Sequence, residues 1–464
     1  MIRLFRHYVP VWFLLLGLAE FAIFIASMYL GEVVRASSIQ DHPWQIDAKA
    51  WSGVLVFSVL MSFNMTIVGL YQRNLEEGRA GVLLRVAVSF LLALMEIGLI
   101  GFLFPDVLTW RRSFLVAFVL AFWGILAARY LFFRLMDEQT LRRRVLVIGT
   151  GQPAQELLGL AAQPGAGFQV VGCVGLPREV RVVPESLQVR LDGPLLDYVR
   201  MREIDEVVVA ISDRREKLPM HELMDCKLSG TRVMEFPFFY EQETGKVILE
   251  HLYPSWFIYS DGFRHSALQS SLKRAFDLLA SLALLSFIWP VMLFTSLAIW
   301  LETRGEGDVF FRQKRLGLGS KVFEVIKFRS MRMDAEADGV ARWATANDNR
   351  VTTIGRFIRK TRIDELPQLW NVFKGEMSFV GPRPERPEFV ETLSQRIPYY
   401  GERHRIRPGI TGWAQVCYSY GASEEDAAEK LRYDLYYLKN HSIFLDFLIM
   451  LRTFEVVLLG RGAR

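Results

Sequence analysis

The stretch "RRRVLVIGTGQPAQELLGLAAQPGAGFQVVGCVG", residues 142–175, decides the fold of the first soluble part of the chain. Its apolar run at 145–148 predicts a buried strand. Gly149, Gly151 and Ala154 then form a GxGxxA turn that leads into a helical segment, and a second apolar run follows. The order strand, glycine turn, helix and strand is typical of a parallel α/β unit.

A further buried strand is predicted in "IDEVVVAIS", residues 204–212, so a Rossmann-like α/β domain is expected over 136–240. A dinucleotide site in such a domain also needs an acid at the end of the second strand, where it holds the ribose. That strand ends here in "VVGCVG", without an acid. The favoured interpretation is a degenerate nucleotide-binding fold without cofactor-binding residues, while regulation by a bound nucleotide or sugar nucleotide stays open as an alternative.

Long apolar runs mark the N-terminal part of the chain as a membrane domain. The protein has 464 residues, of which 51% are hydrophobic, and a net charge of +5. A helix of about 20 residues crosses a bilayer. Four runs of this length predict a four-helix transmembrane bundle within residues 1–135, at 11–31, 51–71, 86–104 and 113–133. Glu20 and Glu96 interrupt two runs, which indicates either a relay or ligand site or contacts between helices.

The distribution of arginines predicts the orientation of this bundle. Arginines lie before the first run, around the second loop and after the fourth run, whereas Arg111 and Arg112 in the third loop argue weakly for the opposite orientation. We expect both ends of the bundle to face the cytoplasm, in a bacterial inner membrane. The three cysteines form no CxxC pair, so neither a zinc site nor a disulfide framework is expected.

A fifth apolar run lies in "SSLKRAFDLLASLALLSFIWPVMLFTSLAIWLETRGEG", residues 270–307, after a predicted connector at 241–270. Pro290 lies in the middle of this run and is expected to kink a helix, because proline lacks the backbone N–H. Basic residues stand on both sides of the run, which places both flanks in the cytoplasm. We therefore predict a re-entrant helix at 275–301 that dips into one leaflet and returns.

The remaining C-terminal domain, 271–464 with this helix, is basic and rich in glycine and proline, and we expect an α+β fold. Gly317 and Gly319 predict a hairpin between two strands. Its basic residues are interleaved with aromatic residues and glycines, which suits specific anion contacts. The membrane-inserted helix and the lack of a nucleic-acid motif argue against nucleic acid as the anion. A phosphate or diphosphate on a small substrate is the better candidate, because arginine forks match phosphate oxygens.

Two adjacent acids, Asp364 and Glu365, lie in "TRIDELPQLWNVFKGEMSFVGPRPE", residues 361–385. Carboxylates can hold Mg²⁺, which a diphosphate substrate needs for charge neutralisation, and one of them can attack phosphorus. The position suits this chemistry if the pair begins a helix, and Pro367 is consistent with a helix start. Arg362 before the pair and Arg383 in the Gly-Pro-Arg-Pro turn make the segment more specific than an isolated Asp-Glu dipeptide.

Three segments together resemble the bacterial sugar transferase family, the monotopic polyprenyl-phosphate glycosyl-1-phosphate transferases. They are "VFFRQKRLGLGSKVFEVIKFRSM" (309–331), "GRFIRKTRIDELPQLWNVFKGEMSFVGPRPE" (355–385) and "RPGITGWAQV" (407–416), and the resemblance covers about 270–464. The four preceding helices and the α/β domain resemble the large members that initiate exopolysaccharide synthesis. The segment 419–447 is similar to a subgroup associated with exosortase-linked clusters.

The resemblance implies transfer of a sugar-1-phosphate from a UDP-sugar to undecaprenyl phosphate, with release of UMP. It implies that Asp364 is the nucleophile of a covalent phospho-sugar intermediate and that Glu365 assists with Mg²⁺ and positioning. Arg383 matches a phosphate-contacting arginine, and Lys327 and Arg329 match a basic pair of the family. The family's helix is re-entrant at the proline, although Trp289 stands here where serine is common.

Other assignments rest on weaker signals. Gln313, Arg315 and Glu385 are further candidates for substrate or phosphate binding, and Arg362 is either a phosphate ligand or a partner of Glu365. We expect a homodimer, through the α/β domain, and contacts with other polysaccharide-assembly proteins. Two rival interpretations are a non-catalytic membrane scaffold that binds sugar nucleotides and an NAD-dependent sugar-nucleotide-modifying enzyme. The second lacks a clear YxxxK pair in the α/β region.

Overall fold

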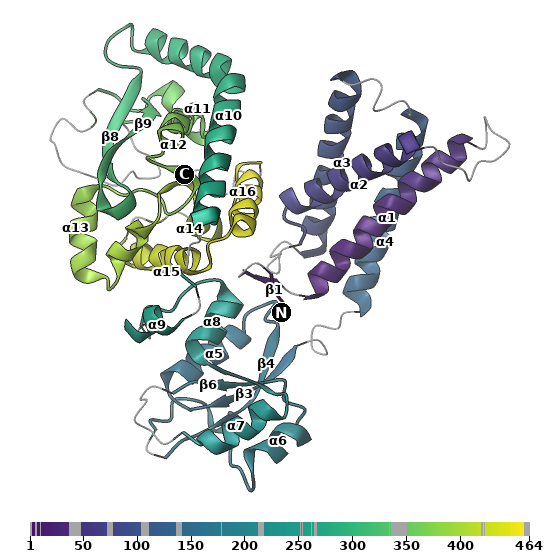
Figure 1. The fold of residues 1–464 in the computed structure, drawn as a ribbon, viewed down its shortest axis with the longest axis vertical. Helices are drawn as coiled ribbons and strands as arrows, with labels where there is room; N and C mark the ends of the chain where they lie inside the picture. Colours follow the sequence, from purple (N-terminus) through teal and green to yellow (C-terminus); the bar gives the residue numbers. More distant parts are fainter. Residues whose placement is uncertain are drawn as a thin grey trace. The chain divides into compact units, whose positions relative to one another are not determined.

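The computed structural model divides into two compact units, with the boundary between Thr244 and Gly245, and each is described by itself (Figure 1). The structure describes residues 2–4, 7–9, 11–36, 48–71, 78–103, 111–135, 142–177, 179–211, 218–250, 252, 254–260, 262–263, 267–333, 335, 350–418, 421 and 423–458. Two short strands, β1 (Ile2–Leu4) and β2 (His7–Val9), precede the first helix.

Four apolar helices form a bundle in the first unit, as the sequence predicts. They are α1 (Val11–Ala36), α2 (Ala48–Ile67), α3 (Gly78–Leu103) and α4 (Arg111–Leu135). Phenylalanines from all four helices pack in the bundle core, with Phe57 edge-on to Phe24 and Phe118 and with Phe90 edge-on to Phe118. Three of these helices, α1, α3 and α4, are long and apolar enough to span a bilayer, and α2 contributes the shorter apolar stretch Trp51–Ile67.

The two acids inside the predicted spans make contacts between helices. Glu20 of α1 forms a buried ion pair with Arg129 of α4 at 2.7 Å, and it accepts a hydrogen bond from the Tyr71 hydroxyl at 2.6 Å. Glu96 of α3 accepts a hydrogen bond of 2.7 Å from Asn64 of α2. Buried charges require such partners, so of the two interpretations of these acids the structure favours helix–helix contact.

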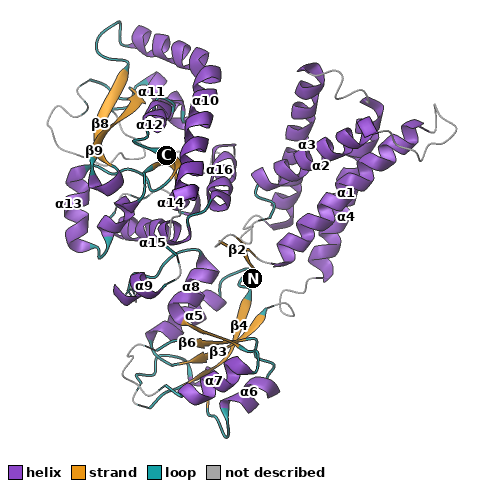
Figure 2. Cartoon of the chain, in the orientation of Figure 1, coloured by secondary structure: helices purple, strands orange, loops and turns teal. Residues whose placement is uncertain are grey.

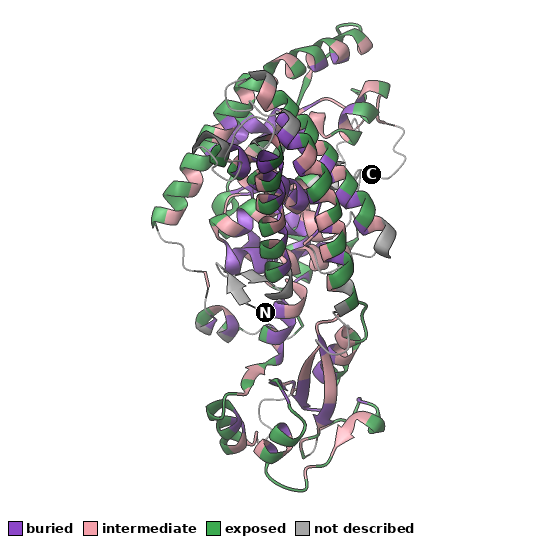
Figure 3. Cartoon of the chain, turned by 90° about the vertical axis from the view of Figure 1, so that its right-hand side faces the viewer, coloured by how far each residue is buried: buried purple, intermediate pink, exposed green. Residues whose placement is uncertain are grey.

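The α/β domain has one parallel sheet of five strands in the order β5-β4-β3-β6-β7, shown in orange in Figure 2. The strands are β3 (Arg143–Ile148), β4 (Phe168–Val174), β5 (Gln188–Val189), β6 (Glu206–Val209) and β7 (Arg232–Glu235). The helices are α5 (Gln152–Ala161), η1 (Glu185–Leu187), α6 (Leu195–Met201), α7 (Met220–Leu228) and α8 (Phe236–Thr244). The strand order reverses between β3 and β6, as in Rossmann-type sheets. Most residues of β3 and β6 are buried, and the sheet shows in purple and pink in Figure 3.

The second unit begins with α9 (Pro254–Tyr259) and the long helix α10 (Ala267–Glu302), which contains Pro290. The α10 helix meets the length and hydropathy expected of a membrane span, and Figure 1 shows that it changes direction along its length. Many of its apolar side chains are exposed within the unit, including Phe287 at 81%. An apolar surface of this extent requires a lipid or protein neighbour.

The rest of this unit is an α+β assembly of short elements around α12 and α15. The strands form the antiparallel hairpin β8 (Phe310–Leu316) and β9 (Val322–Phe328), and the parallel pair β10 (Ser378–Val380) and β11 (Gly409–Thr411). The helices are η2 (Leu318–Ser320), α11 (Thr353–Lys360), η3 (Ile363–Glu365), α12 (Gln368–Lys374), α13 (Pro387–Arg396), η4 (Tyr400–Arg405), α14 (Trp413–Cys417), α15 (Glu424–Asn440) and α16 (Ile443–Leu458). The hairpin predicted at Gly317 and Gly319 is the β8–β9 connection, where Gly319 has a φ of 63°.

The C-terminal helix α16 packs on the core of the unit. Leu445 and Ile449 are fully buried, and Asp446 pairs with Lys273 of α10 at 2.6 Å. Ile443, Phe447 and Phe454 stay exposed on the other side of the helix. The alternation of apolar and charged residues in this segment therefore belongs to a helix that is anchored to the core and presents a second apolar face.

Candidate active site

The acid pair lies in a short turn between two helices. The preceding helix α11 begins at the cap Thr352, whose hydroxyl accepts a hydrogen bond of 2.9 Å from the Gly355 N–H. Arg362 has a φ of 60°, a left-handed conformation that is uncommon outside glycine and that turns the chain after α11. Asp364 and Glu365 follow in the single 3-10 turn η3. The next helix, α12, starts at Gln368 with Pro367 as its cap, so the pair precedes that helix rather than opening it.

Glu365 is surrounded by three cationic side chains. Its Oε1 atom lies 2.9 Å from an Arg383 nitrogen, 3.5 Å from Lys327 Nζ and 3.6 Å from an Arg362 nitrogen. The residue is only 9% exposed. Burial disfavours its charged form, but Arg383, Lys327 and Arg362 together outweigh burial and hold the pKa of Glu365 well below its usual range. Glu365 is therefore a permanent anion that fixes three basic groups in place.

Asp364 has a different environment from its neighbour. Its Oδ1 atom is buried and has no hydrogen-bond partner among the described residues. Burial and the adjacent Glu365 carboxylate raise the pKa of Asp364, and the nearby Lys327, Arg362 and Arg383 only partly oppose this. A buried carboxylate oxygen without a donor is costly in the free protein, so it is available to bond an incoming cation or phosphorus atom.

The β8–β9 hairpin brings Lys327 to the acid pair but leaves Arg329 away from it. Lys327 lies within β9, opposite Phe311, and burial lowers its pKa while Glu365 partly restores it. Arg329 follows the last residue of β9, and its guanidinium lies at the sulfur of Met333. Of Lys327 and Arg329, the two basic residues matched to the family, only Lys327 pairs with an acid of the Asp364–Glu365 pair among the described residues.

The turn that carries Arg383 is held by backbone hydrogen bonds from several segments. The carbonyl of Pro382 accepts from Gly409 N–H at 2.9 Å, and the carbonyl of Glu385 accepts from Leu316 N–H at 3.0 Å. Arg315 donates to the Pro384 carbonyl at 3.1 Å and lies 3.4 Å from the Glu385 carboxylate. Gln313 in turn accepts hydrogen bonds from the Arg315 guanidinium at 2.6 and 3.1 Å. In this structure Gln313, Arg315 and Glu385 thus support the turn that presents Arg383.

Arg403, which sequence reasoning did not single out, completes this support. Its guanidinium is 5% exposed and donates to the Arg383 carbonyl at 3.1 Å. Asp434 of α15 pairs with the same guanidinium at 2.7 Å, and the Tyr400 hydroxyl accepts a hydrogen bond of 2.8 Å from it. Burial raises the pKa of Asp434 to about 6 despite the pairing with Arg403. The sequence signal was weak, because Arg403 is one of several basic residues in 403–407.

Two further buried polar residues connect the site to its scaffold. Asn371 of α12 is fully buried, accepts from the Ile326 N–H at 3.1 Å, and donates to the Glu324 carbonyl at 2.7 Å. It thereby joins α12 to the strand that carries Lys327. Asp277 of α10 accepts hydrogen bonds of 3.1 Å from the Ser378 hydroxyl and the Phe379 N–H, which fixes β10 ahead of the Arg383 turn.

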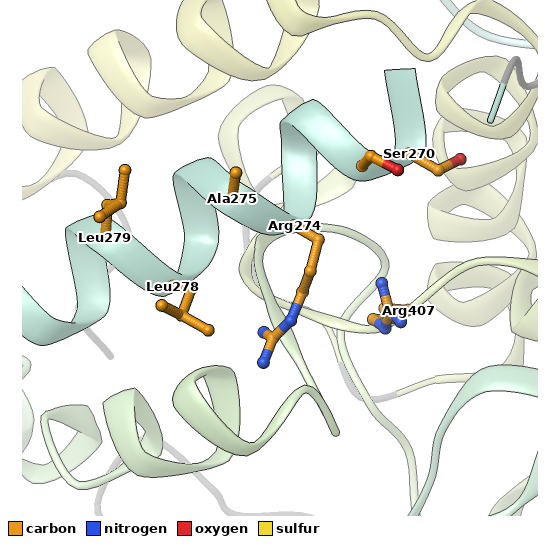
Figure 4. Close-up of a pocket in the computed structure, with 7 residues that line it drawn as sticks. Ser270, Arg274, Ala275, Leu278, Leu279 and Arg407 are labelled. Atoms are coloured by element: carbon orange, nitrogen blue, oxygen red, sulfur yellow. The ribbon is translucent and has the colours of Figure 1, made fainter. Parts of the chain in front are cut away.

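An open cavity of about 660 Å³ lies along the N-terminal half of α10 (Figure 4). Ala275, Leu278 and Leu279 form its apolar wall, and Arg274 and Arg407 contribute guanidinium groups. Arg274 also donates to the carbonyls of Val372 and Phe373 at 2.7 Å, which caps the end of α12. An apolar wall next to basic groups is suited to an amphiphile with an anionic head.

The residues present fit a divalent cation at the acid pair. Hard cations such as Mg²⁺ take carboxylate oxygens and are usually held by one or two carboxylates together with substrate phosphates. Asp364 and Glu365 supply such oxygens, and the unbonded Asp364 Oδ1 is available for a ligand. Within the described part of the chain no group of three or more His, Cys, Asp or Glu residues could hold a metal, so an ion here would depend on substrate oxygens as well.

Comparison with known proteins identifies relatives of both units. The bacterial sugar transferase family matches residues 268–460, and a family described as a CoA-binding domain matches 66–224. The UDP-glucose:undecaprenyl-phosphate glucose-1-phosphate transferase of Escherichia coli (strain K12) is 35% identical over 323 residues, which is 67% of each chain. The UDP-N-acetylgalactosamine-undecaprenyl-phosphate N-acetylgalactosaminephosphotransferase of Aeromonas hydrophila is 42% identical over 242 residues. The undecaprenyl-phosphate glucose phosphotransferase of Komagataeibacter xylinus is 44% identical over 196 residues.

These alignments differ in how much of each protein they include. The Aeromonas alignment covers 52% of this chain and 56% of that protein, and the Komagataeibacter alignment covers 41% of this chain and 36% of that protein. The chain therefore spans about half the length of the Aeromonas protein and about a third of the length of the Komagataeibacter protein.

Proposed function

Because this chain belongs to the bacterial sugar transferase family, we propose that it transfers a sugar-1-phosphate from a UDP-sugar to undecaprenyl phosphate, with release of UMP. The activities of these three relatives, all sugar-phosphate transfers to undecaprenyl phosphate, support this reaction class. The observation that carries the proposal is the asymmetry of the acid pair. Among the described residues, a buried oxygen of Asp364 has no hydrogen-bond partner, whereas Glu365 lies among three cations.

In the first step, an Asp364 carboxylate oxygen attacks the phosphorus that bears the sugar. A new O–P bond forms, the bond between this phosphorus and the bridging oxygen of the diphosphate breaks, and UMP leaves with the electron pair. In the second step, a phosphate oxygen of undecaprenyl phosphate attacks the same phosphorus. The bond to Asp364 breaks, which gives undecaprenyl diphosphate-sugar and regenerates the carboxylate. The sugar on this lipid would be the first sugar of an exopolysaccharide repeat unit.

The cations around Glu365 suit the charge that this chemistry develops. Both steps concentrate negative charge on phosphate oxygens, and prearranged positive groups stabilise that charge without reorganisation. Arg383, Lys327 and Arg362 already lie within 3.6 Å of one Glu365 oxygen, so their side chains converge beside Asp364. When bound at Asp364 and Glu365, Mg²⁺ supplies further charge neutralisation for the diphosphate. The same three side chains orient the substrate phosphates toward the nucleophile.

The acceptor is a lipid phosphate, so the site must lie at a membrane surface. The exposed apolar side chains of α10 suit insertion into a bilayer, and the basic flanks of the helix suit a re-entrant path with both ends in the cytoplasm. We therefore propose that the catalytic unit lies on the cytoplasmic face of the bacterial inner membrane. The cavity with Arg274 and Arg407 is a candidate position for the head of the lipid phosphate and the first part of its chain.

The decisive experiment measures UMP release from a panel of UDP-sugars by purified protein with undecaprenyl phosphate and Mg²⁺. Asp364→Asn tests the nucleophile, and Glu324→Gln, at an exposed acid of β9, is the control. We expect UMP from one sugar, its loss in Asp364→Asn and with EDTA, and its retention in Glu324→Gln. Radiolabelled sugar-phosphate should remain on the wild-type protein when the acceptor is withheld. UMP release that survives Asp364→Asn would remove the covalent mechanism, and no release from any UDP-sugar would overturn the reaction.

A further inference from the structure

The β3–α5 turn of the α/β domain has the geometry of an anion cradle. Gly149 has a φ of 127°, and a Cβ atom there would lie 2.2 Å from the Ala210 carbonyl oxygen, so this position requires glycine. The N–H groups of Thr150 and Gly151 lie in this turn, directly before α5, and Gly151 is the N-cap of that helix. In Rossmann-type domains N–H groups at this place hold a phosphate or diphosphate.

A carboxylate of the chain itself already occupies this cradle. Glu179 accepts hydrogen bonds from the Thr150 N–H at 2.7 Å, the Thr150 hydroxyl at 3.1 Å and the Gly151 N–H at 3.0 Å. Both carboxylate oxygens take part, since Oε2 meets Thr150 and Oε1 meets Gly151. The three donors available to a ligand at this turn are therefore satisfied by an internal anion.

This arrangement does not fit the ligand that the matching domain family is described as binding. CoA and dinucleotides both carry a diphosphate, which would need the same N–H groups and would bring negative charge against Glu179. The strand β4 ends at Val174 and is followed by Gly175, so its end also lacks an acid for a ribose. Two independent requirements of a nucleotide site are thus unmet in this chain.

We propose that Glu179 is the permanent internal ligand of the β3–α5 turn, so that this domain binds neither CoA nor a dinucleotide there. The carboxylate satisfies the N-terminal end of α5 and ties the segment after β4 to the glycine turn. The close approach of the Gly149 backbone to Ala210 and to the Glu179 carboxylate accounts for glycine at this position without a nucleotide. The domain then serves as a structural part of the protein.

The competing account is that Glu179 leaves the turn and holds a ribose when a nucleotide enters. The two accounts predict opposite effects of removing the carboxylate. If Glu179 is the internal ligand, its removal exposes the Thr150 and Gly151 donors and lets a small oxyanion bind. If Glu179 is a ribose ligand, the wild-type protein binds nucleotide and the removal weakens that binding.

Hydrogen–deuterium exchange of the full-length protein in detergent separates these accounts, because the amides of Thr150 and Gly151 report on the turn directly. We expect no change in wild-type exchange with CoA, NAD⁺ or inorganic pyrophosphate. In Glu179→Ala these amides should exchange about tenfold faster, as expected on loss of hydrogen bonds to a charged group, and pyrophosphate should slow them again. Glu185→Ala, an exposed acid of η1, should behave as wild type.

Peptides from β6 serve as the folding control, and Glu179→Gln replaces the alanine variant if β6 loses protection. Protection of the wild-type turn by CoA or NAD⁺ would overturn the proposal. Unchanged exchange of Thr150 and Gly151 in both Glu179 variants would overturn it as well. Neither readout depends on transferase activity, so the result is independent of the function proposed above.

Discussion

The buried guanidinium of Arg403 donates a 3.1 Å hydrogen bond to the backbone carbonyl of Arg383, whose own guanidinium lies 2.9 Å from Glu365. One arginine thus positions another through the main chain. Asp434 pairs with the same guanidinium nitrogen of Arg403 at 2.7 Å, so a continuous set of polar contacts extends from α15 to the acid pair. This arrangement leads to the first of four predictions.

Arg403→Lys should lower kcat/KM for UMP release by about tenfold to a hundredfold, the range expected when a charged hydrogen bond of about 1.5–3 kcal/mol is lost. Lysine keeps the charge opposite Asp434, but it lacks the planar fork whose two terminal nitrogens contact Tyr400 on one side and Asp434 and the Arg383 carbonyl on the other. A double-mutant cycle with Arg383→Lys measures the coupling. If Arg403 acts through Arg383, the double variant should be no slower than the slower single variant. Strictly additive losses would show that Arg403 has a separate role.

The pH dependence of activity should move in opposite directions in two variants. Asp364 must be ionised to attack phosphorus, so activity falls as the pH drops through its raised pKa. Glu365 raises the pKa of Asp364, and Glu365→Gln should therefore move the acid limb to lower pH. Lys327 lowers the pKa of Asp364, and Lys327→Met should move the limb to higher pH. Profiles of kcat/KM between about pH 4 and 9 measure both shifts, even if each variant is slower. Shifts in the same direction would contradict the assignment.

Asn371→Asp should lower the free energy of unfolding by about 2 kcal/mol, because a buried donor to the Glu324 carbonyl is lost. The new carboxylate would also face Glu376, which the Asn371 amide contacts at 2.7 Å. Thermal unfolding of the purified protein, followed by a probe in the catalytic unit, measures the loss. Lys374→Gln, an exposed change at the end of the same helix, is the control. Stability equal to that of the wild type would show that α12 does not depend on this amide.

Arg407→Gln should raise the KM for undecaprenyl phosphate several-fold and leave the KM for the UDP-sugar unchanged. Arg407 borders the apolar cavity along α10, where its charge would attract a lipid phosphate. Initial rates of UMP release, with each substrate varied in turn, separate the two constants. Arg356→Gln, an exposed arginine of α11, should change neither. An increase in the KM for the UDP-sugar alone would place Arg407 on the donor side instead.

Patterns along the chain were enough to locate most elements of the fold. The four apolar runs correspond to α1 to α4, and the predicted strands at 145–148 and 204–212 correspond to β3 and β6. The turn glycines 317 and 319 lie where β8 and β9 connect. Such signals are local, because hydrophobic period, glycine turns and proline act on neighbouring residues. The bounds of α2 and β6 differ from the expected ranges by a few residues, as helix and strand ends depend on packing.

The site could be located from sequence but not assembled from it. The motif around Asp364 and Glu365 marked the position, yet Lys327 and Arg329 were equivalent in the sequence. Only the fold brings Lys327, which is 38 residues away, to Glu365 while Arg329 lies at Met333. In the same way, Gln313, Arg315 and Glu385 were candidates for phosphate binding, and their contacts in the structure are with the Arg383 turn.

The sequence by itself determined the membrane helices, the parallel α/β domain and the segment that carries the acid pair, because each depends on residues that are close in the chain. Tertiary structure alone decided which charges meet. It placed Glu179 in the glycine turn 28 residues before it, Arg403 behind Arg383, and three cations around one oxygen of Glu365, while Asp364 Oδ1 has no hydrogen-bond partner among the described residues. Burial and distance set the strength of a charge interaction, and both arise only when distant segments pack together.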